Sequence, residues 1–179
     1  MREVRLATVS DLDPPTRRWI LINAVIAGAL INLVLNALIA WGRASEVDEI
    51  PLWEESGLST IGDTLGTLVV LPLITTLLIA AGVRREIAHG KLSALERYGG
   101  LAEAARRLPD NMLLRGLVFG LACLVILGPP MAGLLALVDF DDPSTGTFVA
   151  YKAIFGVALG LLVAPFIALD AMARPRKAP

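Results

Sequence analysis

Residues 19–41 read WILINAVIAGALINLVLNALIAW, a stretch of 23 residues without a single charge. As an α-helix it would be roughly 34 Å long at about 1.5 Å per residue, enough to cross a hydrocarbon core of about 30 Å. A tryptophan stands at each end, where its amphipathic ring suits the membrane interface. The stretch is also longer than the roughly 7–15 apolar residues of a cleaved signal peptide. It therefore predicts a retained transmembrane helix.

Three further stretches have the same character. They cover residues 61–83, 113–138 and 148–170, and their few charges lie near their ends. Apolar residues make up 55% of the chain, and most charged residues lie between the four stretches. A bilayer selects this distribution, because an uncharged helix satisfies its own backbone polar groups in hydrocarbon. The sequence predicts an all-α polytopic membrane protein, with residues 1–179 forming one domain of four transmembrane helices.

Lysine and arginine are unevenly distributed among the connecting segments. Residues 1–18, 84–112 and 171–179 together contain 13 of them, whereas residues 42–60 and 139–147 together contain one. Short cytoplasmic segments carry the excess of positive charge. We therefore expect both termini and the loop over residues 84–112 to face the cytoplasm, with the chain in the cytoplasmic or inner membrane of the cell. The two outward loops are acidic, which either attracts a cationic partner or only keeps these loops solvated.

The loop over residues 84–112 has helix signals of its own. Ser93 and Glu96 have the spacing of a capping box, Gly99 and Gly100 can end the helix that it opens, and a second short helix can follow before Pro109. Leucines alternate there with basic residues, which predicts amphipathic helices lying on an anionic membrane surface. A docking surface for a cytosolic partner is the alternative.

The two halves of the chain are similar in the placement of glycine and proline. Four positions recur at offsets of 92 to 94 residues: Gly28 with Gly120, Gly62 with Gly156, Gly66 with Gly160, and Pro72 with Pro165. The recurrence predicts two tandem hairpins of parallel topology, related by a pseudo-two-fold axis along the membrane normal. Chance recurrence is the alternative, because both residue types are common in transmembrane helices.

Small residues and prolines also predict local features of the helices. Pairs of glycines four residues apart allow close helix packing in lipid, within one chain or, alternatively, between two copies of it. The predicted packing residues are Gly62, Gly66, Gly116, Gly120, Gly156 and Gly160. Proline removes a backbone donor and bends a helix. Kinks are predicted at Pro72, Pro129, Pro130 and Pro165.

Polar residues inside a bilayer are costly and are the first place to look for a function. If successive helices alternate in direction, five polar residues reach a similar depth near the outer surface: Asn32, Asn36, Asp63, Thr67 and Lys152. This cluster is either the mouth of a permeation path, with Asp63 as a cation or proton ligand, or a structural set of hydrogen bonds with an Asp63–Lys152 ion pair. Arg115 lies one turn inside its span, from where its side chain is expected to extend back to the headgroups.

The sequence contains no catalytic or cofactor-binding motif. His89 is the only histidine, and the lone Cys123 can form neither an intrachain disulfide nor a multi-thiolate metal site. We therefore expect no enzyme, no cofactor and no metal. A net charge of −1 gives no argument for nucleic acid, so the expected partners are the lipid bilayer, further copies of the chain, or other membrane proteins.

Two functions of different classes remain. The first is a small permease-like or channel-like protein for a small solute or ion, acting through the polar cluster. The second is a non-catalytic structural or assembly subunit that packs against other membrane proteins.

Overall fold

The structure, a computed structural model, describes residues 12–47, 49–54, 57–92 and 108–174, and these form helices and loops without any strand. The helices are α1 (Pro14–Trp19), the π-helix η2 (Ile20–Ile26), α2 (Ala27–Ala44), α3 (Thr60–Ala88), α5 (Met112–Leu137) and α6 (Thr145–Met172). Since α1, η2 and α2 follow one another without a break, we call them together the first rod. The first rod, α3, α5 and α6 are each long and apolar enough to cross a membrane. The all-helical class and the four apolar spans are thus confirmed, whereas the helices predicted after Ser93 lie outside the described residues.

A side-chain cap stands at the start of each long helix. The caps are Asp13, Ser59, Asn111 and Ser144, each accepting a hydrogen bond from a backbone N–H of the first turn. Such caps satisfy donors that a helix leaves free at its start. Local sequence therefore determines where each helix begins.

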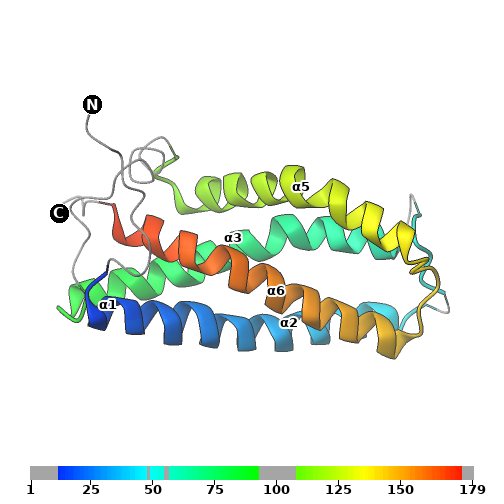
Figure 1. The fold of residues 1–179 in the computed structure, drawn as a ribbon, viewed down its shortest axis with the longest axis horizontal. Helices are drawn as coiled ribbons and strands as arrows, with labels where there is room; N and C mark the ends of the chain where they lie inside the picture. The colour runs from blue at the N-terminus through cyan, green and yellow to red at the C-terminus, as the bar shows by residue number, and fades with distance from the viewer. Residues whose placement is uncertain (1–11, 48, 55–56, 93–107, 175–179) are drawn as a thin grey trace.

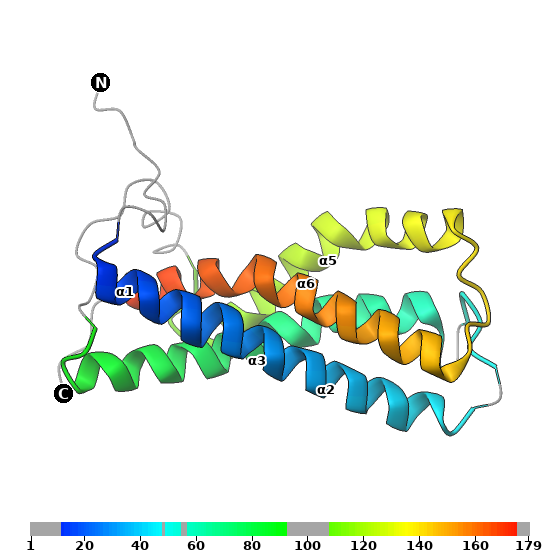
Figure 2. The same cartoon turned by 60° about the horizontal axis from the view of Figure 1, so that its bottom comes forward.

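The main contacts give the helices the order α5, α3, α6, α2, which is how they lie at the acidic end. α3 and α6 cross, so at the basic end α3 lies beside the first rod and α6 beside α5 (Figures 1 and 2). The extensive contacts join α5 to α3, α3 to α6, and α6 to α2. Helices that follow one another in sequence, α2 and α3 or α5 and α6, contact each other much less. Exchanging α2 with α5 and α3 with α6 reverses this order but keeps the same pairs of neighbours. Two tandem repeats related by an axis between α3 and α6 would have this arrangement.

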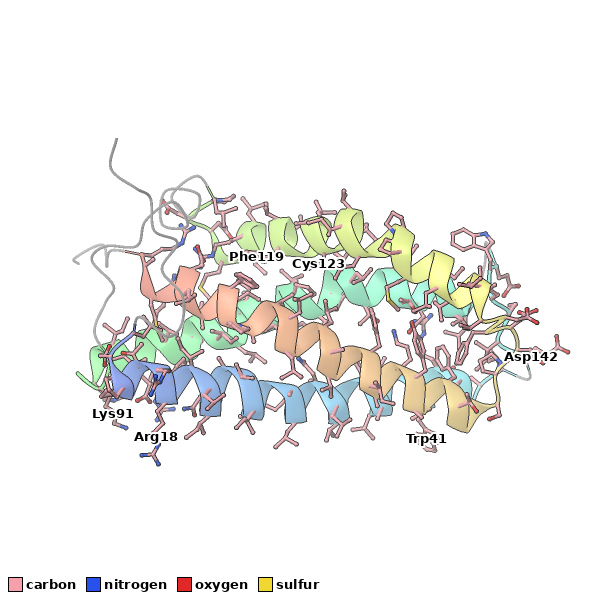
Figure 3. The ribbon with its side chains drawn as sticks, in the orientation of Figure 1. Arg18, Trp41, Lys91, Phe119, Cys123 and Asp142 are labelled. Atoms are coloured by element: carbon pink, nitrogen blue, oxygen red, sulfur yellow. The ribbon has the colours of Figure 1, made fainter. Side chains whose placement is uncertain are left out.

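The two ends of the bundle carry opposite charges. The basic end holds the start of the first rod, the end of α3, the start of α5 and the end of α6 (Figure 1). The acidic end holds the loop between α2 and α3 and the loop between α5 and α6. Figure 3 places Arg18 and Lys91 at the basic end, and Trp41 and Asp142 at the acidic end.

The two acidic-end loops are joined to each other by carboxylates. Asp142 accepts a hydrogen bond from the Ile50 backbone N–H at 3.1 Å, and Asp141 accepts one from the Leu52 N–H at 2.7 Å. Two carboxylates of the acidic end therefore join the loops to each other.

The apolar core lies between the central helices α3 and α6 and the first rod. Leu68 and Val83 of α3 and Ile167 of α6 are almost completely buried. The outer helices instead expose long apolar side chains, such as Leu38 of α2 and Ile126 of α5. Because so wide an apolar surface is unfavourable in water, hydrocarbon is the better solvent for it, and the fold is compatible with an integral membrane protein.

Glycines bring α5 close to α3. A Cβ added at Gly120 would lie 2.5 Å from the Val69 carbonyl oxygen, and a Cβ added at Gly116 would lie 3.0 Å from the Leu73 Cα. These distances are shorter than van der Waals contact, so a side chain at either position would push the helices apart. The backbone of α5 therefore rests directly on the backbone of α3.

The other two predicted glycine pairs differ from each other. Gly156 and Gly160 of α6 lie against side chains of α2. Gly62 and Gly66 of α3 are exposed, and a Cβ added at Gly66 would meet no described atom within 4 Å. Because α3 packs through its other faces, this pair remains open to lipid or to another molecule.

The four prolines predicted to kink helices all lie inside helices that continue past them. Pro72 is in α3, Pro129 and Pro130 are in α5, and Pro165 is in α6. α5 bends along its length (Figures 1 and 2) but stays one helix. The missing proline donors are therefore accommodated by bending, and no unwound segment forms in α5.

Candidate functional site

Three of the five predicted cluster residues meet near the acidic end. Lys152 of α6 is 2% exposed, and its Nζ lies 2.7 Å from Asp63 Oδ2 on α3. The same Nζ donates to Thr67 Oγ1 at 2.5 Å and to the Asp63 carbonyl oxygen at 3.1 Å. Asp63, Thr67 and Lys152 thus join the two central helices through a buried ion pair whose ammonium donors are satisfied.

Arg43 is a fourth member, which we did not predict. From the end of α2, its Nη1 pairs with the other carboxylate oxygen of Asp63. Arg43 is half exposed, whereas Asp63 is nearly buried. We call Arg43, Asp63, Thr67 and Lys152 the acidic-end network; it links α2, α3 and α6, with one carboxylate between two cations.

Aromatic rings pack next to this network. Lys152 Nζ lies 5.5 Å from the centre of the Phe155 ring, within the range of a cation–π contact. Tyr151 stacks on Phe155 and contacts Phe140, with ring centres 5.9 and 5.2 Å apart. The Tyr151 hydroxyl also shares a 2.7 Å hydrogen bond with Thr64 Oγ1. The rings pack against the Lys152 side chain, which is almost completely shielded from solvent near the acidic end.

Asn32 and Asn36 lie apart from the acidic-end network, at the contact between α2 and α6. The Asn36 side chain packs against Gly156 and donates from Nδ2 to the Asn32 carbonyl oxygen at 2.9 Å. Asn32 packs against Gly160, and its side chain, 8% exposed as a residue, has no hydrogen-bond partner among the described residues. Its amide atoms are not among the fully buried unpaired atoms of the described residues, so they remain accessible for hydrogen bonding.

A groove of about 300 Å³ lies between the first rod and α3. Its lining is Trp19, Asn23, Gly28, Ile31 and Asn32 from the first rod, and Thr75, Leu78, Ile79, Gly82, Arg85 and Glu86 from α3. The groove therefore extends from the basic end to Asn32 and Thr75, near the middle of both helices. Its volume is at the lower limit of sites for small molecules, about 300 Å³.

The wall of this groove includes the π-helix η2, which nothing in the sequence had indicated. The Ala27 N–H bonds to the Ile22 carbonyl, five residues back, and Asn23 Nδ2 donates to the Trp19 carbonyl at 3.3 Å. π-Turns are rare, and those that occur are often found at functional sites. Each adds a residue to the turn and so rotates the helix face that follows. The turn thus helps to determine which residues of α2 face α3.

A second ion-pair network lies at the basic end. Arg115 Nε is 3.0 Å from Asp170 Oδ2, and both side chains are almost fully buried. Arg174 joins them, with Nη2 3.2 Å from Asp170 Oδ1 and Nη1 3.2 Å from Asp110 Oδ1. The expectation that Arg115 extends to the headgroups is therefore wrong: it is 1% exposed, because a carboxylate on α6 lies within its reach.

The described residues contain no group of three histidines, cysteines or carboxylates able to hold a metal ion. Comparison with known proteins finds no match to a protein-family model, to a curated protein or to a solved structure.

Proposed function

We propose that the chain is a multi-pass membrane protein with its basic end in the cytoplasm, and that it works as a small permease-like protein through the groove between the first rod and α3. One observation carries the proposal. The seam between these helices holds a groove from the basic end to mid-membrane, while Arg43 and Asp63 bridge the same two helices at the acidic end. A path open on one side and closed on the other is one state of an alternating-access cycle.

The partner-free amide of Asn32 supports this proposal. It lines the inner end of the groove, beside Thr75. A solute that offers a hydrogen-bonding group there would pair with the amide, which lines the groove and is accessible from it. Asn32 is therefore the proposed solute-binding residue, and the acidic-end network is the proposed outer gate.

The tandem repeat is part of the same proposal. The symmetric helix order and the recurring glycines and prolines support two hairpins of parallel topology. The groove itself lies between the two helices of the first hairpin. The Asp63–Lys152 pair joins α3 to α6, the two helices nearest the proposed axis.

Flux measurements in proteoliposomes test the proposal with probes of three charge types. Radiolabelled glycerol, glycine and benzenesulfonate would be offered as a neutral, a zwitterionic and an anionic probe, and ion currents would be recorded in KCl. We expect flux of at least one probe above that of empty liposomes. Asn32→Leu should reduce that flux about tenfold, the effect of losing one good hydrogen bond.

Asn36→Leu is the matched control, because it removes the same group from the same helix outside the groove lining. Its flux should remain closer to that of the unmodified protein once helical content and thermal stability show that both variants fold. Absence of flux for all probes and ions would overturn the permease proposal.

A second function has one observation of its own. The exposed Gly62 and Gly66 of α3 offer a face on which the helix of another membrane protein could pack closely. An assembly subunit of this kind would copurify with a partner in fixed stoichiometry in mild detergent, and Gly66→Leu should abolish the association. Isolation as a lone species, with Gly66→Leu indistinguishable, would eliminate this function.

A further inference from the structure

We infer that the groove binds an amphipathic anion: an acidic group at Arg85, an apolar body along the groove, and a hydrogen-bonding group at Asn32. This assignment rests on the proposed function for the role of the groove, and it names the class of compound that the groove admits. It follows from three parts of the lining, which differ in chemistry.

The basic end of the groove suits an acidic group. Arg85 lines it, is exposed, and has no ion-pair partner among the described residues, whereas the neighbouring Glu86 lies 3.6 Å from Lys91 Nζ. Arg17 and Arg18 begin the first rod at the same end and are also exposed. A guanidinium binds a carboxylate or phosphate through two parallel hydrogen bonds, so Arg85 is suited to hold the acid in one orientation.

The middle of the groove suits an apolar body. Ile31 and Leu78 form its sides and are 47% and 56% exposed, so the groove opens sideways onto the surface that would face hydrocarbon. Gly28 leaves space, since a Cβ there would meet no described atom within 4 Å. A wholly polar compound would lose its hydration next to these apolar side chains, which is unfavourable. An apolar chain would bury its surface against them, which is favourable.

The end of the groove near the middle of the helices suits a polar group of the ligand. Asn32 and Thr75 lie there, roughly 15 Å from Arg85 along α3 at about 1.5 Å per residue. A hydroxyl or carbonyl of the ligand at that distance from its acid would hydrogen-bond to the unpartnered Asn32 amide. The length and polarity of the groove thus specify an acid and a distant polar group separated by hydrocarbon.

Trp19 gives a direct readout of binding, because its indole lines the groove opposite Gly82. In a Trp41→Phe/Trp53→Phe background, Trp19 would be the only tryptophan. The protein would be placed in phosphatidylcholine nanodiscs, and 9,10-dibromostearate would be added as the quencher. We expect saturable quenching that stearate, 12-hydroxystearate or phosphatidylglycerol reverses, with the more effective competitor identifying a free amphiphile or a membrane lipid as the source.

Arg85→Gln should weaken dibromostearate binding about tenfold. Arg84→Gln, which removes the same charge from the adjacent position outside the groove lining, should leave it nearly unchanged. Competition by 12-hydroxystearate should be several-fold stronger than by stearate, and Asn32→Leu should remove that difference. Quenching that does not saturate, equal losses in both arginine variants, or equal competition by the two stearates would overturn the assignment.

The binding assay does not involve transport, so the two proposals fail separately. Saturable, Arg85-dependent binding without flux would reject the permease and keep the site. Flux of glycerol or glycine without quenching would reject the amphipathic anion and keep the permease.

Discussion

Asp63 is the residue on which the acidic-end network depends. Its carboxylate pairs with two cations, and these two cations differ in their exposure to solvent. Lys152 is buried and has Asp63 as its counter-charge, whereas Arg43 is half exposed and can be solvated.

Replacing Asp63 by asparagine should therefore destabilise the fold more than replacing Lys152 by methionine. Asp63→Asn leaves a buried ammonium uncompensated, which costs about 3–5 kcal/mol. Lys152→Met leaves Asp63 paired with Arg43 and should cost about 1–2 kcal/mol. Unfolding titrations in mixed detergent micelles measure both, and the reverse order would contradict this account of the network.

The buried Arg115–Asp170 pair at the basic end also leads to a prediction about stability, and a double variant tests it. Asp170→Leu alone strands the Arg115 guanidinium in the core, whereas Arg174 keeps its contact with Asp110. We expect a loss of about 3–5 kcal/mol for the single variant, and recovery of most of it in Arg115→Met/Asp170→Leu, since an apolar pair needs no counter-charge. A double variant as unstable as the sum of its singles would show that the pair does not act as a unit.

The sequence allowed part of this chemistry to be predicted. Asp63 and Lys152 could be paired because helix direction alone puts them at one depth. Arg43 was missed because it was considered only as a loop charge, although it ends one span as Asp63 begins the next. The separation of Asn32 from Asp63 was unpredictable, because depth does not say which helix lies beside which.

The helices themselves were predictable, and their neighbours were not. Capping residues determine where each helix begins. The long apolar stretches make each helix able to cross a bilayer. Glycine pairs indicate a face for close packing without naming the partner: Gly120 rests on Val69, while Gly66 faces outward. The π-turn in the first rod had no sequence signal, because its residues are as apolar as the α-helical ones around them.

Matched substitutions at Gly120 and Gly66 test these helix contacts. Gly120→Ala forces a methyl group against the α3 backbone and should destabilise the bundle by about 2 kcal/mol, in the range found for overpacking. Gly66→Ala enters open space and should be neutral or slightly stabilising, because alanine favours the helix by up to about 1 kcal/mol. Thermal unfolding in detergent compares them. A large loss for Gly66→Ala would mean that this face is occupied by another molecule.

The sidedness of the whole bundle is open to a direct labelling test. In a Cys123→Ser background, Ser45→Cys places a thiol at the acidic end and His89→Cys places one at the basic end; both positions are exposed. A membrane-impermeant maleimide should label Ser45→Cys in intact cells and His89→Cys only after lysis. Labelling of His89→Cys in intact cells would reverse the proposed orientation.

The order of the helices also has a consequence for biosynthesis. When α2 and α3 have been inserted, they share little contact, and α5 adds a large contact only to α3. The first rod acquires its main neighbour when α6, the last of the four spans to be synthesised, enters the membrane. A ribosome that stalls before residue 145 would thus leave the first rod without its main neighbour, and the native helix contacts of the first rod form only after α6 has been made.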